Sequence, residues 1–132
     1  MIVLDASAVV DLLLGIEPQG PAILERVLEP AQTLHSPALL DAEVLHAIRR
    51  RLRREVLSTA RAREAVTDLL DLRLVRYPLP PLVERMWELR EKLTAYDAAY
   101  VALAEALDAP LVTCDRGLAE SPGHGARIEA YP

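Results

Sequence analysis

Short apolar runs alternate along the chain with longer segments in which apolar residues recur every three or four positions. The short runs are rich in β-branched residues and predict strands at residues 2–5, 33–35, 74–77, 110–114 and 127–130, of which 74–77 is either a strand or a connection. The periodic segments predict helices at residues 8–14, 21–28, 58–70, 80–93 and 94–107, with one more helix after residue 35. This alternation favours an α/β fold, in which a central, mostly parallel sheet is flanked by helices on both faces.

Local signals place the ends of several of these helices. Gly15 follows the first helical pattern and is predicted to end that helix. Ser36 is a typical N-cap residue, and Pro37 after it suits the first helical position, so a helix that carries Glu43 is expected to begin there. The segment 94–97 (TAYD) resembles a capping box at the start of an alanine-rich helix.

The size and composition of the chain point to one aliphatic domain. A chain of 132 residues is long enough for a single substantial core. We find no internal repeat, low-complexity tract or linker, so residues 1–132 are expected to form one domain. Hydrophobic residues make up 52% of the chain, aromatic residues only 4%, and Phe is absent. The core is therefore expected to consist of Leu, Val, Ile and Ala side chains.

Charge and cysteine usage narrow the class of protein. The formal net charge of -5 argues against a protein that coats nucleic acid by general electrostatic attraction. The single cysteine, Cys114, excludes an internal disulfide and a multi-cysteine metal site, which agrees with a reducing compartment. There is no signal-peptide pattern, and charges interrupt every apolar stretch before it reaches membrane-spanning length. We therefore expect a cytoplasmic protein without a membrane association.

Positive charge is concentrated in one segment of this acidic chain. Residues 49–54 (RRRLRR) form a basic block, and Arg61 and Arg63 follow it closely. Two interpretations stay open at this point. The block contacts phosphates, or it is a solvated helix surface on which the arginine stems cover apolar neighbours.

Several carboxylates are predicted to meet at one rim of the sheet. Asp5 ends the first predicted strand, and Asp115 follows the strand that contains Thr113. Ligands of parallel α/β sheets bind beyond the carboxyl ends of the strands, so both carboxylates are expected at the binding rim. Asp97 lies in the first turn of a helix, and Glu43 borders an apolar helix stripe, where an ionised carboxylate needs a partner.

Each of these residues also has an ordinary structural explanation. Asp5 caps the following helix, Asp115 starts a turn, Asp97 completes the capping box of Thr94, and Glu43 pairs with an arginine. Two hydroxyl residues also have both a functional and a structural interpretation. Ser7 lies two residues from Asp5, and Thr113 lies two residues from Asp115, so each hydroxyl projects to the same side as its aspartate if the chain is extended. Alternatively, Ser7 and Thr113 are local caps. Taken singly, none of these residues shows whether its role is structural or catalytic.

The joint order of three segments is more specific. The segments IVLDASAVV, SPALLDAEVLHAI and TAYDAAYVALAEALDAPLVTCDRGLA resemble the PIN-domain family, especially its VapC-like ribonuclease toxins of toxin–antitoxin pairs, over nearly the whole chain. The last segment is the most specific, because an aspartate opens an alanine-rich helix and a strand then ends in Thr-x-Asp followed by a basic residue. Carried over by position, the acidic residues of the family fall on Asp5, Glu43, Asp97 and Asp115, with Ser7 and Thr113 as supporting hydroxyls.

The resemblance implies a metal-dependent ribonuclease. Carboxylates crowded at one rim repel each other, and a hard divalent cation such as Mg²⁺, with Mn²⁺ as a substitute, removes that penalty. Asp5 and Asp97 are the first candidates as direct metal ligands, while Glu43 and Asp115 are expected to hold a second ion, orient water or accept its proton. The candidate RNA contacts are Arg49, Arg50, Arg53 and Arg116. The family also implies a homodimer and a VapB-like antitoxin as partner, and the mean hydropathy of +0.14 fits apolar surface buried between chains.

Two other classes are weighed against this one. A phosphotransfer domain of the receiver or dehalogenase type also places an aspartate after a strand, but the further acidic and lysine positions are not evident, since Lys92 is the only lysine. The other alternative is a non-catalytic PIN-like module whose acidic rim binds a basic partner segment. Metal-dependent RNA cleavage by the purified chain separates these hypotheses.

Overall fold

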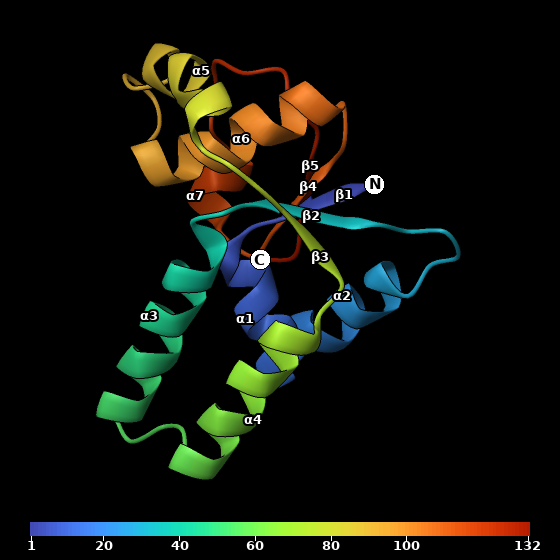
Figure 1. Cartoon of the computed structure of the whole chain (residues 1–132), viewed down its shortest axis with the longest axis vertical. Coiled ribbons are helices and arrows are strands. Elements are labelled where there is room, and N and C mark those ends of the chain that lie inside the picture. Colours follow the sequence, from blue (N-terminus) through green and yellow to red (C-terminus); the bar gives the residue numbers. More distant parts are fainter.

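Five parallel strands form the centre of the molecule (Figure 1). The computed structural model describes residues 1–132, and its strands are β1 (Ile2–Leu4), β2 (Leu34–Pro37), β3 (Leu74–Tyr77), β4 (Leu111–Thr113) and β5 (Ile128–Ala130). Their order across the sheet is β3-β2-β1-β4-β5, and every neighbouring pair is parallel. Val3 in the central strand lies opposite His35 on one side and Leu111 on the other. The sheet is thus wholly parallel.

Helices cover both faces of this sheet, as the alternation predicted. The first two crossovers carry α1 (Ala6–Leu14), α2 (Gln19–Val27), α3 (Leu40–Arg53) and α4 (Thr59–Asp71), while the later ones carry a 3₁₀ turn, η1 (Pro80–Leu82), and the helices α5 (Val83–Glu88), α6 (Ala95–Leu107) and α7 (Arg116–Ala119). Figure 1 shows α1 to α4 gathered on one side of the sheet and α5 to α7 on the other. Right-handed crossovers require this division, because the chain moves across the sheet in opposite directions before and after α5.

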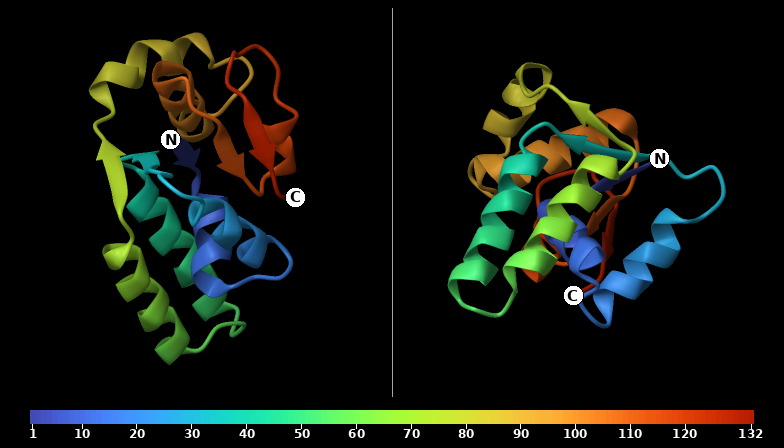
Figure 2. Two further views of the ribbon diagram at one scale, coloured as in Figure 1. Left: turned by 90° about the vertical axis from the view of Figure 1, so that its right-hand side faces the viewer. Right: turned by 60° about the horizontal axis from the view of Figure 1, so that its bottom comes forward.

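The core is aliphatic and is centred on β1 and α6. All three residues of β1 are buried, and α6 packs against β1, β2 and β4. Its residues 98–104 are buried without interruption, and small Ala side chains among them let the helix approach the sheet closely. Tyr100 is the one aromatic side chain in this core. Figure 2 shows α6 lying across the strands.

The ends of α1 agree with the sequence signals. Asp5 is the N-cap, with an extended backbone, and the helix begins at Ala6, two residues before the predicted start. Gly15 ends it at φ +62, in the left-handed region that glycine adopts without a steric penalty. Ser7 therefore lies in the first helical turn, and the extended geometry considered for residues 5–7 is wrong.

The segment at Ser36 and Pro37 differs from the prediction. Both residues belong to β2 rather than to a helix start, and α3 begins only at Leu40. The Ser36 hydroxyl donates to the carbonyl of Leu4 in the neighbouring strand, which uses the side chain that was expected to cap a helix. Pro37 is the last residue of β2, so its missing N–H does not interrupt the backbone hydrogen bonds in the middle of the strand. Ser and Pro suit the end of a strand as well as the start of a helix. Only the pairing of this segment with β1 and β3 shows that it is a strand.

Smaller differences occur later in the chain. Residues 74–77 form a strand, which resolves that ambiguity, and the helix predicted for 80–93 is divided into η1 and the short α5, which ends at Glu88. Asp115, considered as the start of a turn, is followed by the four-residue helix α7. No helix has both the length and the apolar composition needed to cross a membrane.

The sheet order creates a defined place for a site. From β1 the chain moves towards β2 and β3, whereas from β4 it moves the opposite way to β5. The adjacent strands β1 and β4 therefore mark a topological switch point, where diverging connections leave a crevice beyond the carboxyl ends. Asp5 directly follows β1, and Thr113 and Asp115 lie at the end of β4.

Candidate active site

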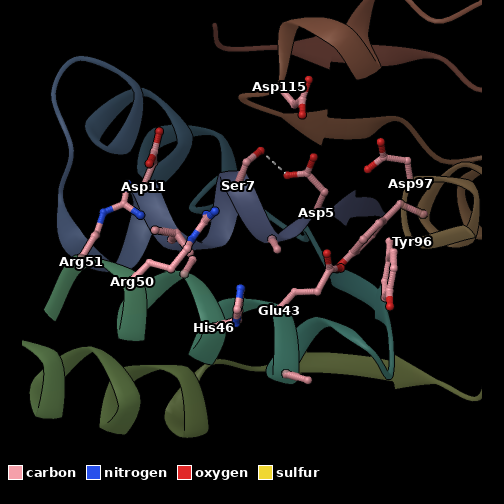
Figure 3. Close-up of a pocket in the computed structure, with 15 residues that line it drawn as sticks. Asp5, Ser7, Asp11, Glu43, His46, Arg50, Arg51, Tyr96, Asp97 and Asp115 are labelled. Carbon is pink, nitrogen blue, oxygen red and sulfur yellow. Dashed lines mark hydrogen bonds between the residues drawn. The ribbon is translucent and has the colours of Figure 1, made fainter. Parts of the chain in front are cut away.

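A cleft of about 730 Å³ opens at this switch point. The four carboxylates singled out from the sequence all line it, although they come from four separate segments of the chain: Asp5, Glu43, Asp97 and Asp115. Figure 3 shows Asp5 at the centre, with Asp115, Asp97 and Glu43 around it. The parallel sheet explains this convergence, because the helix starts that follow its strands all lie at one rim.

Asp5 is held by three donors. Its Oδ1 accepts hydrogen bonds from the Ser7 hydroxyl at 2.6 Å and from the Ala8 amide at 2.9 Å, while Oδ2 accepts one from Thr113 Oγ1. Ser7 Oγ in turn accepts from the Cys114 amide at 2.9 Å. These contacts join β1 to the end of β4, so both supporting hydroxyls orient the Asp5 carboxylate.

The helix starts account for the positions of the other two aspartates. Asp115 caps α7, because its Oδ1 accepts from the Leu118 amide at 3.0 Å, and its own amide donates to Thr113 Oγ1 at 2.9 Å. The Asp97 amide donates to the Thr94 hydroxyl, which is the N-cap of α6. Both aspartates therefore lie at the start of a helix, and the same geometry places their carboxylates at the cleft.

Glu43 and Asp41 lie two residues apart on α3 and have different surroundings. The Glu43 carboxylate faces the cleft and accepts a hydrogen bond from the Tyr100 hydroxyl at 2.7 Å. Asp41 points elsewhere and forms a bidentate pair with Arg76 of β3, with N···O distances of 2.6 and 2.8 Å. The arginine partner considered for Glu43 from the sequence is absent, and a tyrosine takes its place.

The cleft raises the pKa of its carboxyl groups. Burial raises the pKa of Asp5 to about 6 against the lowering effect of its hydrogen bonds, and the charge of Asp97 adds to the rise. Burial also raises the pKa of Asp97, with the neighbouring Asp115 as the second cause. The pKa of Glu43 is raised by burial and by Asp97, while the Tyr100 hydroxyl lowers it. Burial and mutual repulsion thus disfavour the charged form of three acidic groups in one cleft.

The donor chemistry fits a hard divalent cation. All the acidic donors are carboxylate oxygens, none of them is in an ion pair with an arginine, and their mutual repulsion favours a bound positive charge. No three acidic, histidine or cysteine side chains converge closely enough to form a complete metal cage. Mg²⁺ suits such a set, since it keeps several waters and takes one or two carboxylates together with substrate phosphate.

The structure separates the arginines of the basic block. Arg50 lines the cleft, and so does Arg51, which the sequence analysis did not select. The other candidates, Arg49, Arg53 and Arg116, are exposed and lie outside the cleft lining. Neither Arg50 nor Arg51 is in an ion pair, whereas six other arginines of the chain are. Two unpaired cations therefore face the carboxylates across the same cleft.

Three further residues that the sequence analysis did not select line the cleft: Asp11, His46 and Tyr96. The sequence contains a pattern that could have placed His46 and Arg50 in the cleft. His46, Ala47 and Arg50 follow Glu43 by three, four and seven residues, which is the spacing of one helix face. Once Glu43 is placed in the cleft, helical periodicity places this face there too.

Comparisons with known proteins agree with the geometry. The family model described as PIN domain matches residues 2–123. Ribonuclease VapC12 of Mycobacterium tuberculosis is 46% identical over 129 residues, which cover 98% of each chain. Among solved structures, PAE2754 from Pyrobaculum aerophilum has a TM-score of 0.72 at 26% identity, covering 96% of this chain and 81% of that one. A toxin–antitoxin complex from Klebsiella pneumoniae has a TM-score of 0.65 at 18% identity, covering 98% and 96%, and shows the same fold. The chain therefore belongs to the PIN-domain family and, within it, to the VapC proteins.

Proposed function

We propose that this protein is a metal-dependent ribonuclease that hydrolyses RNA phosphodiester bonds as the toxin of a VapBC-type pair, with residues 1–132 acting as one catalytic domain in the cytoplasm. The observation that carries the proposal is the convergence of four carboxylates from four segments in one cleft, none of them in an ion pair. Membership of the VapC proteins supports RNA as the substrate, since relatives at 46% identity are named ribonucleases.

Asp5 and Asp97 are the residues that would hold Mg²⁺, or Mn²⁺ in its place, while Glu43 and Asp115 would bind a second ion or orient the attacking water. When bound, the cation polarises the scissile phosphate and lowers the pKa of its water. The chain's own part is to fix the ligands. Ser7 and Thr113 hold Asp5, and Tyr100 holds Glu43, so the carboxylates need little reorganisation when the ion and the phosphate arrive.

Arg50 and Arg51 are the proposed contacts to RNA phosphates. They lie on the α3 wall, beyond His46 as seen from the carboxylates (Figure 3). A phosphate group at the acidic centre is repelled by the carboxylates, so cations further along the cleft are needed to attract the RNA strand. Arg49, Arg53 and Arg116 remain candidates only for contacts beyond the cleft.

The test is cleavage of RNA by the purified protein with Mg²⁺, with Mn²⁺ and with a chelator. We expect cleavage only with added metal, and a loss of at least about a hundredfold in Asp97→Asn, because the amide cannot supply the negative charge of a metal ligand. Asn keeps the shape of Asp97, and the cap of α6 survives, because the Thr94 hydroxyl accepts from the backbone amide. The matched control is Asp68→Asn, an exposed aspartate on α4 outside this cleft, and it should cleave at the wild-type rate.

Two results would contradict the proposal. If Asp97→Asn cleaves at the wild-type rate with the same metal requirement, Asp97 is a capping-turn residue only. If the folded wild type cleaves no RNA and gains no thermal stability from either metal, the acidic rim is a binding surface for a basic partner segment.

The proposal includes two protein partners. Family membership and the shared fold of a toxin–antitoxin complex support a VapB-like antitoxin. Exposed apolar side chains support a homodimer as well: Leu24 on α2, Leu28 directly after that helix, and Val83 and Trp87 on α5. Light scattering that gives only a monomer mass at micromolar concentration would exclude the dimer, and failure to co-purify with the small protein encoded beside it would exclude the antitoxin.

A further inference from the structure

The cleft has different chemistry at its two ends. In Figure 3, Arg50 and Arg51 lie at one end together with Asp11, the four candidate metal-site carboxylates occupy the middle, and Tyr96 stands at the other end beside Asp97. An RNA strand presents phosphates and bases, which need different partners. The arginine end supplies charge for phosphates, whereas the Tyr96 end supplies an aromatic ring and no positive charge.

Tyr96 and Tyr100 lie one helical turn apart on α6 and both line the cleft, but their surroundings differ. Tyr100 is 2% exposed, and its hydroxyl donates to Glu43. Tyr96 is 63% exposed, at the open mouth of the cleft. The fold therefore explains Tyr100 through core packing and a buried hydrogen bond, and it gives no such reason for Tyr96.

The ring of Tyr96 also lacks the partners that other aromatic rings have here. Tyr77 packs against His35 with ring centroids 5.7 Å apart, and the exposed ring of Trp87 is covered by the guanidinium of Arg90 at 4.5 Å. Neither a ring nor a cation lies over Tyr96. An uncovered aromatic face beside the proposed metal ligands is a surface on which a nucleic-acid base can stack.

We propose that Tyr96 is the base-stacking residue of this cleft and that it restricts the substrate to RNA with an unpaired base next to the scissile phosphate. The inference rests on the proposed function, because it takes Asp97 to be at the reacting phosphate. A base reaches the ring only when it leaves its stack and turns towards α6. A base inside a duplex stays stacked, so the duplex forfeits this contact while its phosphates still meet Arg50 and Arg51.

The test compares wild type, Tyr96→Ala, Tyr96→Phe and the control Leu70→Ala, which removes an exposed apolar side chain on α4 outside the cleft lining. The substrates are a mixed-sequence single-stranded RNA whose cleaved bond is first mapped, the same RNA annealed to its complement, and versions with one abasic nucleotide on either side of that bond. Steady-state kinetics with Mg²⁺ give kcat and KM for each combination.

We expect Tyr96→Ala to raise KM for the single strand roughly tenfold, in line with the loss of one stacked base, while Tyr96→Phe and Leu70→Ala stay near wild type. On the RNA that lacks the stacking base, wild type and Tyr96→Ala should have equal KM values. An equal loss on the normal and both abasic RNAs would overturn the proposal, since Tyr96 would then act by positioning Asp97. Full retention of KM in Tyr96→Ala, with weaker capture of the antitoxin, would make the ring a protein contact.

A binding measurement keeps the two proposals separable. Fluorescence anisotropy of the same RNAs is measured with Asp97→Asn alone and with Asp97→Asn combined with Tyr96→Ala. We expect the first to prefer the single strand over the duplex and the second to lose that preference. If wild type cleaves no RNA, the ribonuclease proposal fails, and this measurement alone decides on stacking: equal binding of single strand and duplex by Asp97→Asn rejects it.

Discussion

Acidic residues are treated in opposite ways in two regions of this molecule. Away from the cleft the half-buried ones are paired: Arg76 with Asp41, Arg85 with Glu105, and Arg26 with Glu129. Inside the cleft they are not, and the pKa values of Asp5, Asp97 and Glu43 are raised by burial and by repulsion from acidic neighbours. Arg50 and Arg51 line the same cleft without pairing to any of them.

The paired acidic residues contribute to the stability of the fold, whereas the unpaired ones in the cleft favour the binding of a cation. The paired residues fasten elements to one another: Arg26 holds the last strand to α2, and Arg76 holds β3 to α3. The unpaired residues store unfavourable electrostatic free energy that a cation would release on binding. A fold under selection for stability alone would pair or neutralise them, so the cleft is the region where stability is given up for ligand binding.

The largest expected effect is at Asp5. Because its pKa is about 6 in the folded protein against an ordinary 3.8, the folded state holds the proton more tightly than the unfolded state does. The free energy of unfolding therefore falls as pH rises from about 4 to above 6, on the order of 3 kcal/mol, when no metal is present. Asp5→Asn should remove this contribution, leaving the falls that come from Asp97 and Glu43, and should also remove the stabilisation by Mg²⁺ at pH 7.

Urea unfolding of wild type and Asp5→Asn at a series of pH values measures this. Thr113→Val is a useful companion, because it removes a donor to Asp5 and should move the wild-type transition to higher pH. If the free energy of unfolding depends on pH in the same way for wild type and Asp5→Asn, the titration of Asp5 does not cause the fall in stability.

A smaller effect is expected at Arg76, in the paired region. Arg76→Gln leaves Asp41 without its bidentate partner and should lower the free energy of unfolding by no more than about 1 kcal/mol, since both side chains are partly exposed and water screens the pair. Cleavage at saturating Mg²⁺ should stay at the wild-type rate. A stability loss as large as that predicted for the Asp5 transition would mean that the two regions do not differ in the way described.

The smallest effect concerns the salt dependence of RNA binding. Arg50→Gln removes one cation from the cleft, so the slope of log affinity against log salt should become shallower by about 0.7 for single-stranded RNA. Arg63→Gln is the control, as an exposed arginine on α4 without an ion pair and outside the cleft lining. Equal slopes for wild type and Arg50→Gln would remove Arg50 from the phosphate path.

Much of the architecture was predictable because its signals are local. Aliphatic strands, the glycine after α1 and the Thr94 cap of α6 are all visible within a few residues, and parallel strands necessarily bring their carboxyl ends together. That is why Asp5 and Asp115 were placed at one rim from the sequence. Each of these aspartates follows a strand and precedes a helix, so the same residue caps the helix and lies at the rim of the sheet.

The errors came from contacts distant in the sequence. Ser36 and Pro37 have the local chemistry of a helix start, but a bond to Leu4 and pairing with Tyr77 make them strand residues. Glu43 and Asp41 are equally acidic and equally near the start of α3, and only Arg76, 35 positions after Asp41, separates their roles. The placement of Arg51, His46 and Tyr96 depends on how α3 and α6 face each other, which no local pattern shows.

The contact between Thr113 and Asp5 has a consequence for synthesis of the protein on the ribosome. The two residues that hold this carboxylate in place are separated by 108 positions, and β4 must pair with β1 before they meet. A nascent chain that has not yet emerged beyond residue 115 lacks Thr113, Asp115 and the neighbour of β1, so its cleft is unassembled. In a partly translated chain, the set of carboxylates proposed to bind the metal ion is therefore incomplete.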